Sequence, residues 1–264
     1  MLQTVEQLLN IRKPDTFAGS VSTVARYFYV KACKFAGITR HTSVRDSSIK
    51  LVAHPGCTIA EKLAIVGLYD REAMQYIADH LTPDDVFWDI GANIGPFSIL
   101  AAQAGATVYS FEPHPVTFGR LVENLEANGI AGTAHQIALT DHCGTVQFAD
   151  SAGSASNGIV SIGGITVQCS TGDDFAQSRR PPTWVKIDTE GHELAVITGM
   201  SGILHGVKYL SFEANGLSSA DDLERIRQLL VAAGLRVGLL SDGQLIEMQS
   251  LGSKSPKGDY HAIR

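Results

Sequence analysis

The chain has 264 residues, of which 44% are hydrophobic and 18% are charged. This balance argues against a disordered chain and predicts a soluble globular protein with one large α/β domain and an extension, or two small domains. No apolar run approaches the length of about 18 residues that a membrane-spanning helix needs, and the first residues lack the basic-then-apolar order of a secretion signal. We therefore expect a cytoplasmic protein without a transmembrane segment.

The net charge of −6 is unevenly distributed along the chain. Residues 1–50 hold eight Lys/Arg and three Asp/Glu, a net charge of +5 that leaves −11 for residues 51–264. The basic segment could contact an anionic substrate or a membrane surface, or could be a solvated helical cap. The acidic remainder argues against nucleic acid as a partner. The four cysteines lack C-x-x-C spacing, which argues against a zinc ribbon or a disulfide framework.

The elements expected before residue 81 are mostly helical. Residues 1–50 are predicted to be helical, with a short strand from Ser48 to Val52. The segment from Ala60 to Leu81 is predicted to form one helix or two, and Thr82-Pro83 ends it. We interpret residues 1–80 as an N-terminal helical extension.

From residue 81 onward, apolar runs of strand length alternate with helical patterns. The predicted strands are 86–90, 107–111, 135–139, 184–187, 208–212, 235–240 and 260–263. Helices are predicted to begin near Ile94, Pro115, Glu190 and Ser219, and 145–149 with 165–169 to form an antiparallel insertion. This alternation predicts an α/β, Rossmann-like, doubly wound sheet of about seven mostly parallel strands over residues 81–264.

The strongest chemical signal is the turn Asp89-Ile90-Gly91-Ala92-Asn93-Ile94-Gly95 between the first of these strands and its helix. Ligands of open α/β sheets bind at the carboxyl ends of the strands, so a nucleotide-like cofactor is expected here. Glycines at 91 and 95 let the backbone come close to a ligand. The acidic Asp89 suits a cofactor that carries an ammonium group and a sulfonium.

The same turn does not fit a dinucleotide. The fingerprint G-x-G-x-x-G places its second and third glycines where this chain has Asn93 and Pro96. Proline also removes a backbone N–H that a phosphate would use. A nucleoside cofactor without phosphate fits better. Glu112, at the end of the second strand and 21 residues after Gly91, could accept the hydrogens of both ribose hydroxyls, or could be a solvated strand-end glutamate.

A second group of ionisable residues follows the fourth strand, in Lys186-Ile187-Asp188-Thr189-Glu190-Gly191-His192-Glu193. Charged groups gathered at the carboxyl edge of a sheet are typical of an active site, because burial and mutual repulsion shift their pKa values. The alternative is that they stabilise the N-terminus of the next helix. We assign that simpler role to one of the two glutamates.

In order and spacing, DIGANIG, FEPHP, IALTD (Ile137 to Asp141) and WVKIDTEGHEL resemble the FkbM-type methyltransferases. The resemblance covers roughly Leu68 to the C-terminus, and the KID-x-EG-x-E string is its distinctive part. It implies a class I methyltransferase fold with S-adenosyl-L-methionine as cofactor and S-adenosyl-L-homocysteine as product. It also implies O-methylation of a hydroxyl on a sugar, polyketide or other natural product.

The resemblance further implies residue roles. The turn would surround the amino-acid part of the cofactor, Glu112 would hold the ribose, Ala138 and Leu139 would flank the adenine, and Asp188 would face the methyl group. The predicted cofactor-binding residues are Asp89, Gly91, Ala92, Asn93, Gly95, Glu112, Pro113, His114, Ala138 and Leu139.

An alcohol needs a base to draw off its proton before it attacks a methyl group. Asp188 is the first candidate for this base and His192 the second, since histidines titrate near neutral pH. We predict no metal, but Asp188, Glu213 and Asn215 end neighbouring strands and are the set that could hold Mg²⁺ or Ca²⁺. The simpler interpretation of Glu213 and Asn215 is a substrate hydrogen bond or a loop anchor.

Several functions remain open at this point. The leading hypothesis is an O-methyltransferase that acts on a small molecule or a glycan. Loops build acceptor pockets, so an N-methyltransferase or an enzyme that acts on protein or lipid is the alternative among enzymes. A non-catalytic cofactor-binding protein is the alternative of another class, and Asp188 and His192 beside an intact glycine turn argue against it. The sequence also leaves open a homo-oligomer.

Overall fold

The structure is a computed structural model, which describes residues 17–43, 49–55, 57–66, 70–132, 134–150, 158–160, 164–214, 218–252 and 258–264. The chain forms two compact units, one within residues 1–71 and a larger one that begins at Glu72. The domain boundary after residue 80 stays a prediction. Among the helices that are described, none has both the length and the apolar composition needed to cross a membrane.

In its described residues, the first unit combines two helices with a two-stranded sheet. Its elements are α2 (Phe17–Phe35), β1 (Arg40–Ser43), β2 (Lys50–Ala53) and α3 (Thr58–Val66). The strand predicted at 48–52 is present as β2, from Lys50 to Ala53, and Ser48 lies outside the described residues. The prediction of helix up to residue 50 is wrong at β1, because the left-handed Gly37 follows the last turn of α2 and the next residues pair antiparallel with β2.

The basic character of this unit is partly neutralised inside the unit. Glu61 on α3 pairs with Lys31 and Lys34 on α2, at N–O distances of 3.2 and 2.9 Å. Burial alone would raise the pKa of Glu61, but the two ammonium groups outweigh it and lower that pKa. Two lysines of the basic segment, residues 1–50, therefore stabilise the packing of α2 on α3.

The second unit contains the predicted doubly wound sheet. In spatial order the eight strands are β12 (Gln244–Glu247), β11 (Arg236–Ser241), β13 (Gly258–Ile263), β10 (Tyr209–Ala214), β9 (Trp184–Ile187), β3 (Val86–Ile90), β4 (Thr107–Phe111) and β5 (Ala134–His135). Strands β10, β9, β3, β4 and β5 are parallel, whereas β13 runs antiparallel between β10 and β11. The β12 hairpin strand was not predicted.

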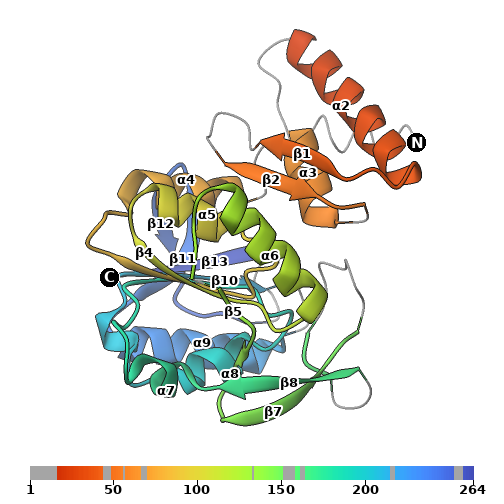
Figure 1. Ribbon diagram of the computed structural model, residues 1–264. Coiled ribbons are helices and arrows are strands. Elements are labelled where there is room, and N and C mark those ends of the chain that lie inside the picture. Colours follow the sequence, from red (N-terminus) through yellow and green to blue (C-terminus); the bar gives the residue numbers. More distant parts are fainter. Residues whose placement is uncertain are drawn as a thin grey trace. The chain divides into compact units, whose positions relative to one another are not determined.

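Helices cover both faces of this sheet (Figure 1). One face carries α4 (Arg71–His80), α5 (Pro96–Gln103) and α6 (Pro115–Ala127), and the other carries α7 (Gly172–Ala176), α8 (Glu193–Gly199) and α9 (Ala220–Ala232). A short 3-10 helix, η1 (Leu204–Gly206), precedes β10. Strand residues alternate between the faces, so Trp88, Ile187 and Phe212 join the core on the α8–α9 side.

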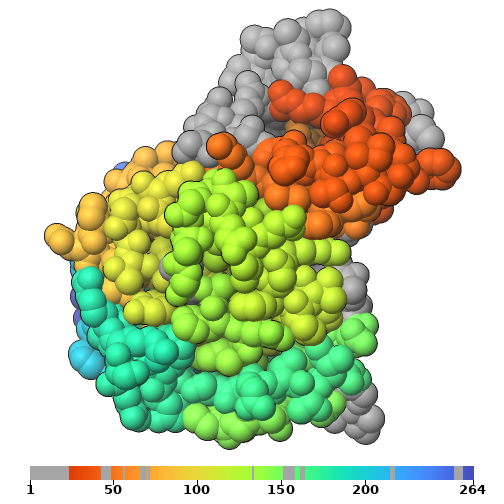
Figure 2. All heavy atoms as spheres, viewed as in Figure 1, coloured from red at the N-terminus to blue at the C-terminus, as the bar shows by residue number. Residues whose placement is uncertain are grey.

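The predicted third strand, 135–139, is in fact two strands in different sheets. β5 extends the main sheet, whereas β6 (Ala138–Leu139) pairs with β8 (Ile165–Ser170), which pairs antiparallel with β7 (Gly144–Phe148). The predicted antiparallel insertion is confirmed, and Figure 2 shows β7 and β8 on the surface of the molecule. An apolar run alone does not reveal that the chain changes sheets between His135 and Ala138.

The edge of the sheet opposite the strands' carboxyl ends is held by one carboxylate. Asp85, which is buried, accepts hydrogen bonds from the Thr82 and Thr183 hydroxyls at 2.7 and 2.9 Å and pairs with Lys208 Nζ at 2.7 Å. These partners precede β3, β9 and β10. Burial would raise the pKa of Asp85, but Lys208 and the hydroxyls outweigh it and lower the pKa from 3.8 to about 2.

We expect Asp85→Ala to lower the free energy of unfolding at neutral pH by about 2–3 kcal/mol, because three strand starts lose their shared acceptor. The folded pKa lies below the unfolded one, so this contribution is present above pH 3.8 and is lost as the pH falls toward 2. Urea unfolding at several pH values measures it. Asp84→Ala, at the exposed neighbouring residue, is the control, and equal stability of the two variants at neutral pH would contradict the assignment.

Candidate active site

The candidate site lies where the order of the strands reverses. From β3 the chain proceeds to β4 and β5 on one side, and it later returns to add β9 and β10 on the other side. Loops that follow adjacent strands therefore diverge between β3 and β9, and open α/β sheets bind their ligands at such a position. The turn after β3 and the segment after β9 both lie here.

The predicted glycine turn is folded tightly onto the end of β4. The backbone N–H groups of Gly91 and Ala92 both donate to the carbonyl of Phe111, at 3.0 and 2.9 Å. Gly91, Asn93 and Gly95 all have left-handed backbone conformations, with φ of 78°, 51° and 87°. A Cβ at Gly91 would lie 1.9 Å from the carbonyl oxygen of Asp188. Glycine at 91 is therefore required by the contact between the two loops.

Asp89 lies below this turn in a buried chain of hydroxyl groups. Its Oδ2 accepts a hydrogen bond from Ser98 Oγ at 2.6 Å, and Ser98 Oγ in turn accepts one from Ser110 Oγ at 2.7 Å. Burial raises the pKa of Asp89 to about 6, although Ser98 and Lys186 act against that rise. Asp89 thereby links β3, β4 and α5.

Glu112 is fixed by the backbone on both of its oxygens. Oε2 accepts from the N–H of Asn93 at 3.1 Å, and Oε1 accepts from the N–H of His114 at 2.9 Å. The side chain is buried, and burial raises the pKa of Glu112 to about 7. Because each carboxyl oxygen can accept more than one hydrogen bond, two sites for hydroxyl donors remain.

Four other predicted cofactor residues are buried, on two segments of the second unit. Pro113 and His114 connect β4 to α6, and Ala138 and Leu139 form β6. The ring of His114 is 1% exposed, with Nε2 3.5 Å from Asp150 Oδ1. Neither ring nitrogen of His114 has a hydrogen-bond partner among the residues that the structure describes. A ring of this kind is ready to bond a polar ligand atom.

The loop after β9 is shaped by Glu193. This buried carboxylate accepts hydrogen bonds from the N–H and hydroxyl of Thr189, from the N–H of Gly191, and from the Ser218 hydroxyl, at 2.9 to 3.2 Å. It is the glutamate with the structural role. The helix predicted from Glu190 begins only at Glu193, because Glu190 and Gly191 have φ of 54° and 98°, outside the helical region.

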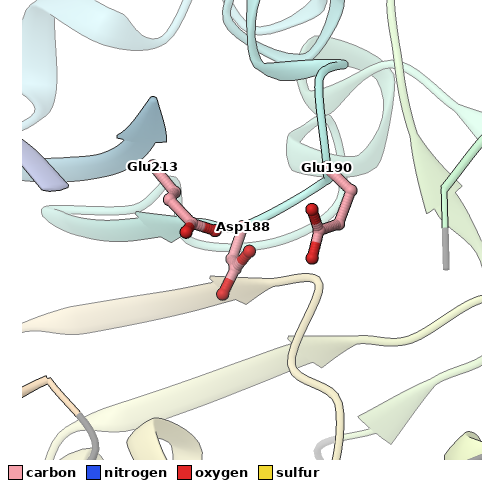
Figure 3. Close-up of side chains that lie close together, drawn as sticks. All are labelled: Asp188, Glu190 and Glu213. Carbon is pink, nitrogen blue, oxygen red and sulfur yellow. The ribbon is translucent and has the colours of Figure 1, made fainter. Parts of the chain in front are cut away.

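The loop brings three carboxyl groups together. One oxygen from each of Asp188, Glu190 and Glu213 lies within 4.8 Å of the others, and their side chains point toward one another in Figure 3. Burial, and then the nearby Asp188, raises the pKa of Glu213 to about 8, so Glu213 keeps a proton at neutral pH. Lys186 Nζ lies 3.3 Å from Asp188 Oδ2. The prediction that Asp188 and Glu213 end neighbouring strands is confirmed.

Such a cluster could bind a divalent cation, although a proton on Glu213 and the Lys186 ammonium already offset its negative charge. Glu190 was not predicted as a member, because its place in the cluster depends on the left-handed turn of the loop. The third predicted oxygen ligand, Asn215, lies outside the described residues.

His192, the second predicted base, is engaged through its ring. Nε2 lies 2.9 Å from the carbonyl oxygen of Ile159, so this nitrogen donates a hydrogen bond to the 158–160 segment. A Cβ at Gly158 would lie 3.4 Å from Glu190, so the segment packs on the same loop. Ser98 and Ser110, which hold Asp89, were not predicted, since nothing in their spacing links them to it.

We expect Gly91→Ala to lower the free energy of unfolding by about 2 kcal/mol or more, because its methyl group would displace the Asp188 carbonyl at an unfavourable φ. Thermal and urea unfolding measure this loss. Gly119→Ala is the matched control: Gly119 is exposed on α6 with open space around it, and alanine there should stabilise by about 0.5–1 kcal/mol. Full stability of the Gly91 variant would contradict the contact.

Comparison with known proteins identifies relatives of this chain. The family model for the methyltransferase FkbM domain matches residues 89–237. Hexuronic acid methyltransferase AglP of Haloferax volcanii is 29% identical over 161 residues, which are 60% of this chain and 67% of that protein. The 31-O-demethyl-FK506 methyltransferase FkbM of Streptomyces tacrolimicus is 44% identical over 66 residues, which are 24% of this chain and 25% of that protein.

Solved structures also resemble this chain, at lower sequence identity. The precorrin-6y C5,15-methyltransferase of Geobacter metallireducens has a TM-score of 0.44 at 16% identity and covers 73% of this chain and 87% of its own. A tRNA (uracil-54, C5)-methyltransferase of Pyrococcus abyssi has a TM-score of 0.47 at 11% identity and covers 85% of this chain and 43% of its own.

The family model spans more than half of the chain, from the glycine turn into β11. The chain therefore belongs to the FkbM family of S-adenosyl-L-methionine-dependent methyltransferases.

Proposed function

We propose that the chain methylates a neutral hydroxyl group of a sugar, polyketide or similar natural product, with Asp188 as the base. The observation that carries this proposal is a partly exposed carboxylate at the end of β9, in contact with the turn after β3 and flanked by Lys186 and Glu213. Two carboxyl groups with different proton occupancy beside one ligand site suit acid–base chemistry.

The residues around the turn fit the cofactor of the family. S-adenosyl-L-methionine, when bound, supplies a methyl group activated by a sulfonium. Glu112 is held at the end of β4 with acceptor sites left for the two ribose hydroxyls. The buried ring nitrogens of His114 have no hydrogen-bond partner within the described structure, with Asp150 Oδ1 3.5 Å from Nε2, and they offer polar contacts beside that sugar. Ala138 and Leu139 are the apolar residues assigned to the adenine, and Pro113 is a further predicted cofactor-binding residue.

An oxygen acceptor is supported by the relatives. The names of two of them specify a hexuronic acid and a demethylated oxygen of FK506 as what they act on. This chain aligns with 67% and 25% of those proteins, so their acceptors serve as guides to a chemical class. Sugars and polyketides share hydroxyl groups as methylation sites.

The acidic cluster argues for a neutral acceptor. A carboxylate acceptor would be ionised at neutral pH, would need no base, and would be repelled by Asp188 and Glu190. A hydroxyl acceptor has the opposite needs, because its proton must leave as the carbon–oxygen bond forms. Asp188 takes that proton, while Lys186 and the protonated Glu213 stabilise the carboxylate before transfer. The remaining contribution is alignment of the hydroxyl with the methyl group.

The cofactor site is tested by Asp89→Ala and Glu112→Ala. We expect each to weaken binding of S-adenosyl-L-homocysteine at least about tenfold, or about 1.4 kcal/mol. Asp89→Ala removes the buried carboxylate that supports the turn, and Glu112→Ala removes the proposed acceptor of the ribose hydroxyl groups. Isothermal titration calorimetry measures the affinity, and Glu126→Ala, at an exposed position on α6, is the control. Wild-type affinity in both variants would remove these assignments.

The chemistry is tested with an acceptor panel of a methyl glycoside, a macrolide with a free hydroxyl, a hexuronate and a primary amine. We expect methyl transfer to a hydroxyl, detected by mass spectrometry, and a loss of at least about 100-fold in kcat for Asp188→Asn. His192→Gln, which keeps a donor for Ile159, should lose less. Transfer to the amine alone would favour N-methylation, and cofactor binding without any transfer would favour a non-catalytic protein.

The same assay separates a proton-based site from a metal-based one. Turnover should persist after exhaustive chelation, because Lys186 and the proton on Glu213 already offset the carboxylate charge. Loss of turnover on chelation, with recovery on adding Mg²⁺ or Ca²⁺, would instead assign Asp188, Glu190 and Glu213 to a cation.

A further inference from the structure

Lys186 is a buried lysine that the proposed reaction uses only as a cation beside the Asp188 carboxylate. It lies in the middle of β9, is 2% exposed, and extends toward the α5 face, with Nζ 5.3 Å from the centroid of the Phe97 ring. A buried ammonium costs several kcal/mol in lost hydration unless its partners compensate for it. An apolar side chain of the same length would fill this space without that cost. The charge is therefore expected to have a purpose.

The strand register shows what surrounds Lys186. Across the sheet it is level with Asp89 on β3 and with Ser211 on β10, and Ser211 is level with His261 on β13. All four side chains are buried. One step closer to the carboxyl edge, on the same face, Asp188 follows Lys186 and Glu213 follows Ser211. Lys186 therefore lies directly beneath the two carboxyl groups of the proposed reaction.

The ionisable groups that face Lys186 carry unequal charge at neutral pH. His261 is neutral, because burial and then Lys186 lower its pKa to about 4. Glu213 is largely protonated, since its pKa is raised to about 8. The carboxyl groups of Asp188 and Asp89 remain as counterions on β9 and β3, and α5 contributes the uncharged ring of Phe97. Lys186 Nζ forms an ion pair with Asp188 Oδ2, at 3.3 Å.

We propose that Lys186 is a positioning residue of the methyl transfer, whose buried ammonium binds one oxygen of Asp188 and holds that carboxyl group in place as the base. The proposal rests on the function proposed above. One oxygen of Asp188 is bound from below, which leaves the other to take the proton of the acceptor. Without the ammonium, Asp188 would lose its ion pair and would lie beside Glu213 with no cation from its own strand to hold its orientation.

A purely structural role for Lys186 makes a different prediction. If the side chain only fills the core, Lys186→Met should be tolerated better than Lys186→Arg, because methionine matches the volume and the guanidinium is larger. If the charge positions Asp188, the order is reversed. The two variants together therefore separate filling from positioning.

The first measurement is the single-turnover rate as a function of pH, with saturating S-adenosyl-L-methionine and the hydroxyl acceptor found in the panel. We expect Lys186→Met to lose at least about tenfold at pH 7 and its half-maximal activity to move up by about one pH unit. Lys186→Arg should retain more activity and the wild-type midpoint. Lys208→Met, which breaks the Asp85 pair at the opposite edge of the sheet, should lower stability without moving the midpoint.

The second measurement needs no acceptor. Side-chain carboxyl groups labelled with ¹³C are titrated by NMR in the complex with S-adenosyl-L-homocysteine, and Asp188→Asn assigns the signals. We expect the Asp188–Glu213 pair to titrate at higher pH in Lys186→Met. If the wild type methylates no hydroxyl but this shift occurs, the proposed function fails and the role of Lys186 in holding Asp188 stands.

The inference is overturned if Lys186→Met matches the wild type in rate, pH midpoint and NMR titration, or outperforms Lys186→Arg. Should the methionine variant fail to fold, Lys186→Gln provides the same comparison, since it keeps a hydrogen-bond donor but no charge. Affinity for S-adenosyl-L-homocysteine within about threefold of wild type, or about 0.65 kcal/mol, shows that the cofactor side of the site is intact.

Discussion

The contact between the turn after β3 and the loop after β9 is the constraint on which the rest of the site depends. The Gly91 Cα lies against the Asp188 carbonyl, and the Asp188 N–H donates to the Ile90 carbonyl at 2.9 Å. A side chain at position 91 would push these loops apart. Because the contact exists, residues assigned to the cofactor and residues assigned to the chemistry come from adjacent strand ends, and rigid strands rather than flexible loops set their separation.

Burial and hydrogen bonds act in opposite directions on the two carboxyl groups beneath the glycine turn. Asp89 and Glu112 are both hidden under the turn, and burial raises both of their pKa values, to about 6 and about 7. Their hydrogen bonds oppose that rise: hydroxyl groups support Asp89, and backbone N–H groups support Glu112. The carboxyl groups are therefore held in one orientation before any ligand arrives. Such preorganisation reduces the ordering cost of binding.

The sequence was sufficient for the parts of the fold that repeat a local pattern. Strands such as 86–90 and 107–111 were predicted residue for residue, since a buried parallel strand is a short apolar run between breakers. The change of sheet between β5 and β6 was missed, because it depends on β8, some 30 residues further on, and no local pattern encodes it. β1 was missed for the same reason, as its strand state comes from pairing with β2.

In the site, too, local patterns were predictable from the sequence and tertiary contacts were not. Glycine and carboxylate spacing was enough to predict Asp89, Glu112 and Asp188 at one edge of the sheet, because the edge follows from strand direction alone. It was not enough to identify what supports them. Ser98 on α5 donates a hydrogen bond to Asp89 on β3, and Glu190 joins the acidic cluster because its own backbone is left-handed. Both are tertiary or conformational facts that spacing in the sequence does not contain.

The segment from Asp188 to Glu193 carries three carboxyl groups, and the backbone conformation places each of them in a different environment. Glu193 is at the start of α8 and is buried, and four donors hydrogen-bond its carboxylate, so it has a structural role. Glu190 is turned into the cluster by its positive φ. Asp188 continues β9 and so inherits the alternation that puts it on the same face as Lys186. Asp188, the proposed base, is therefore the one of the three that pairs with a cation from its own strand.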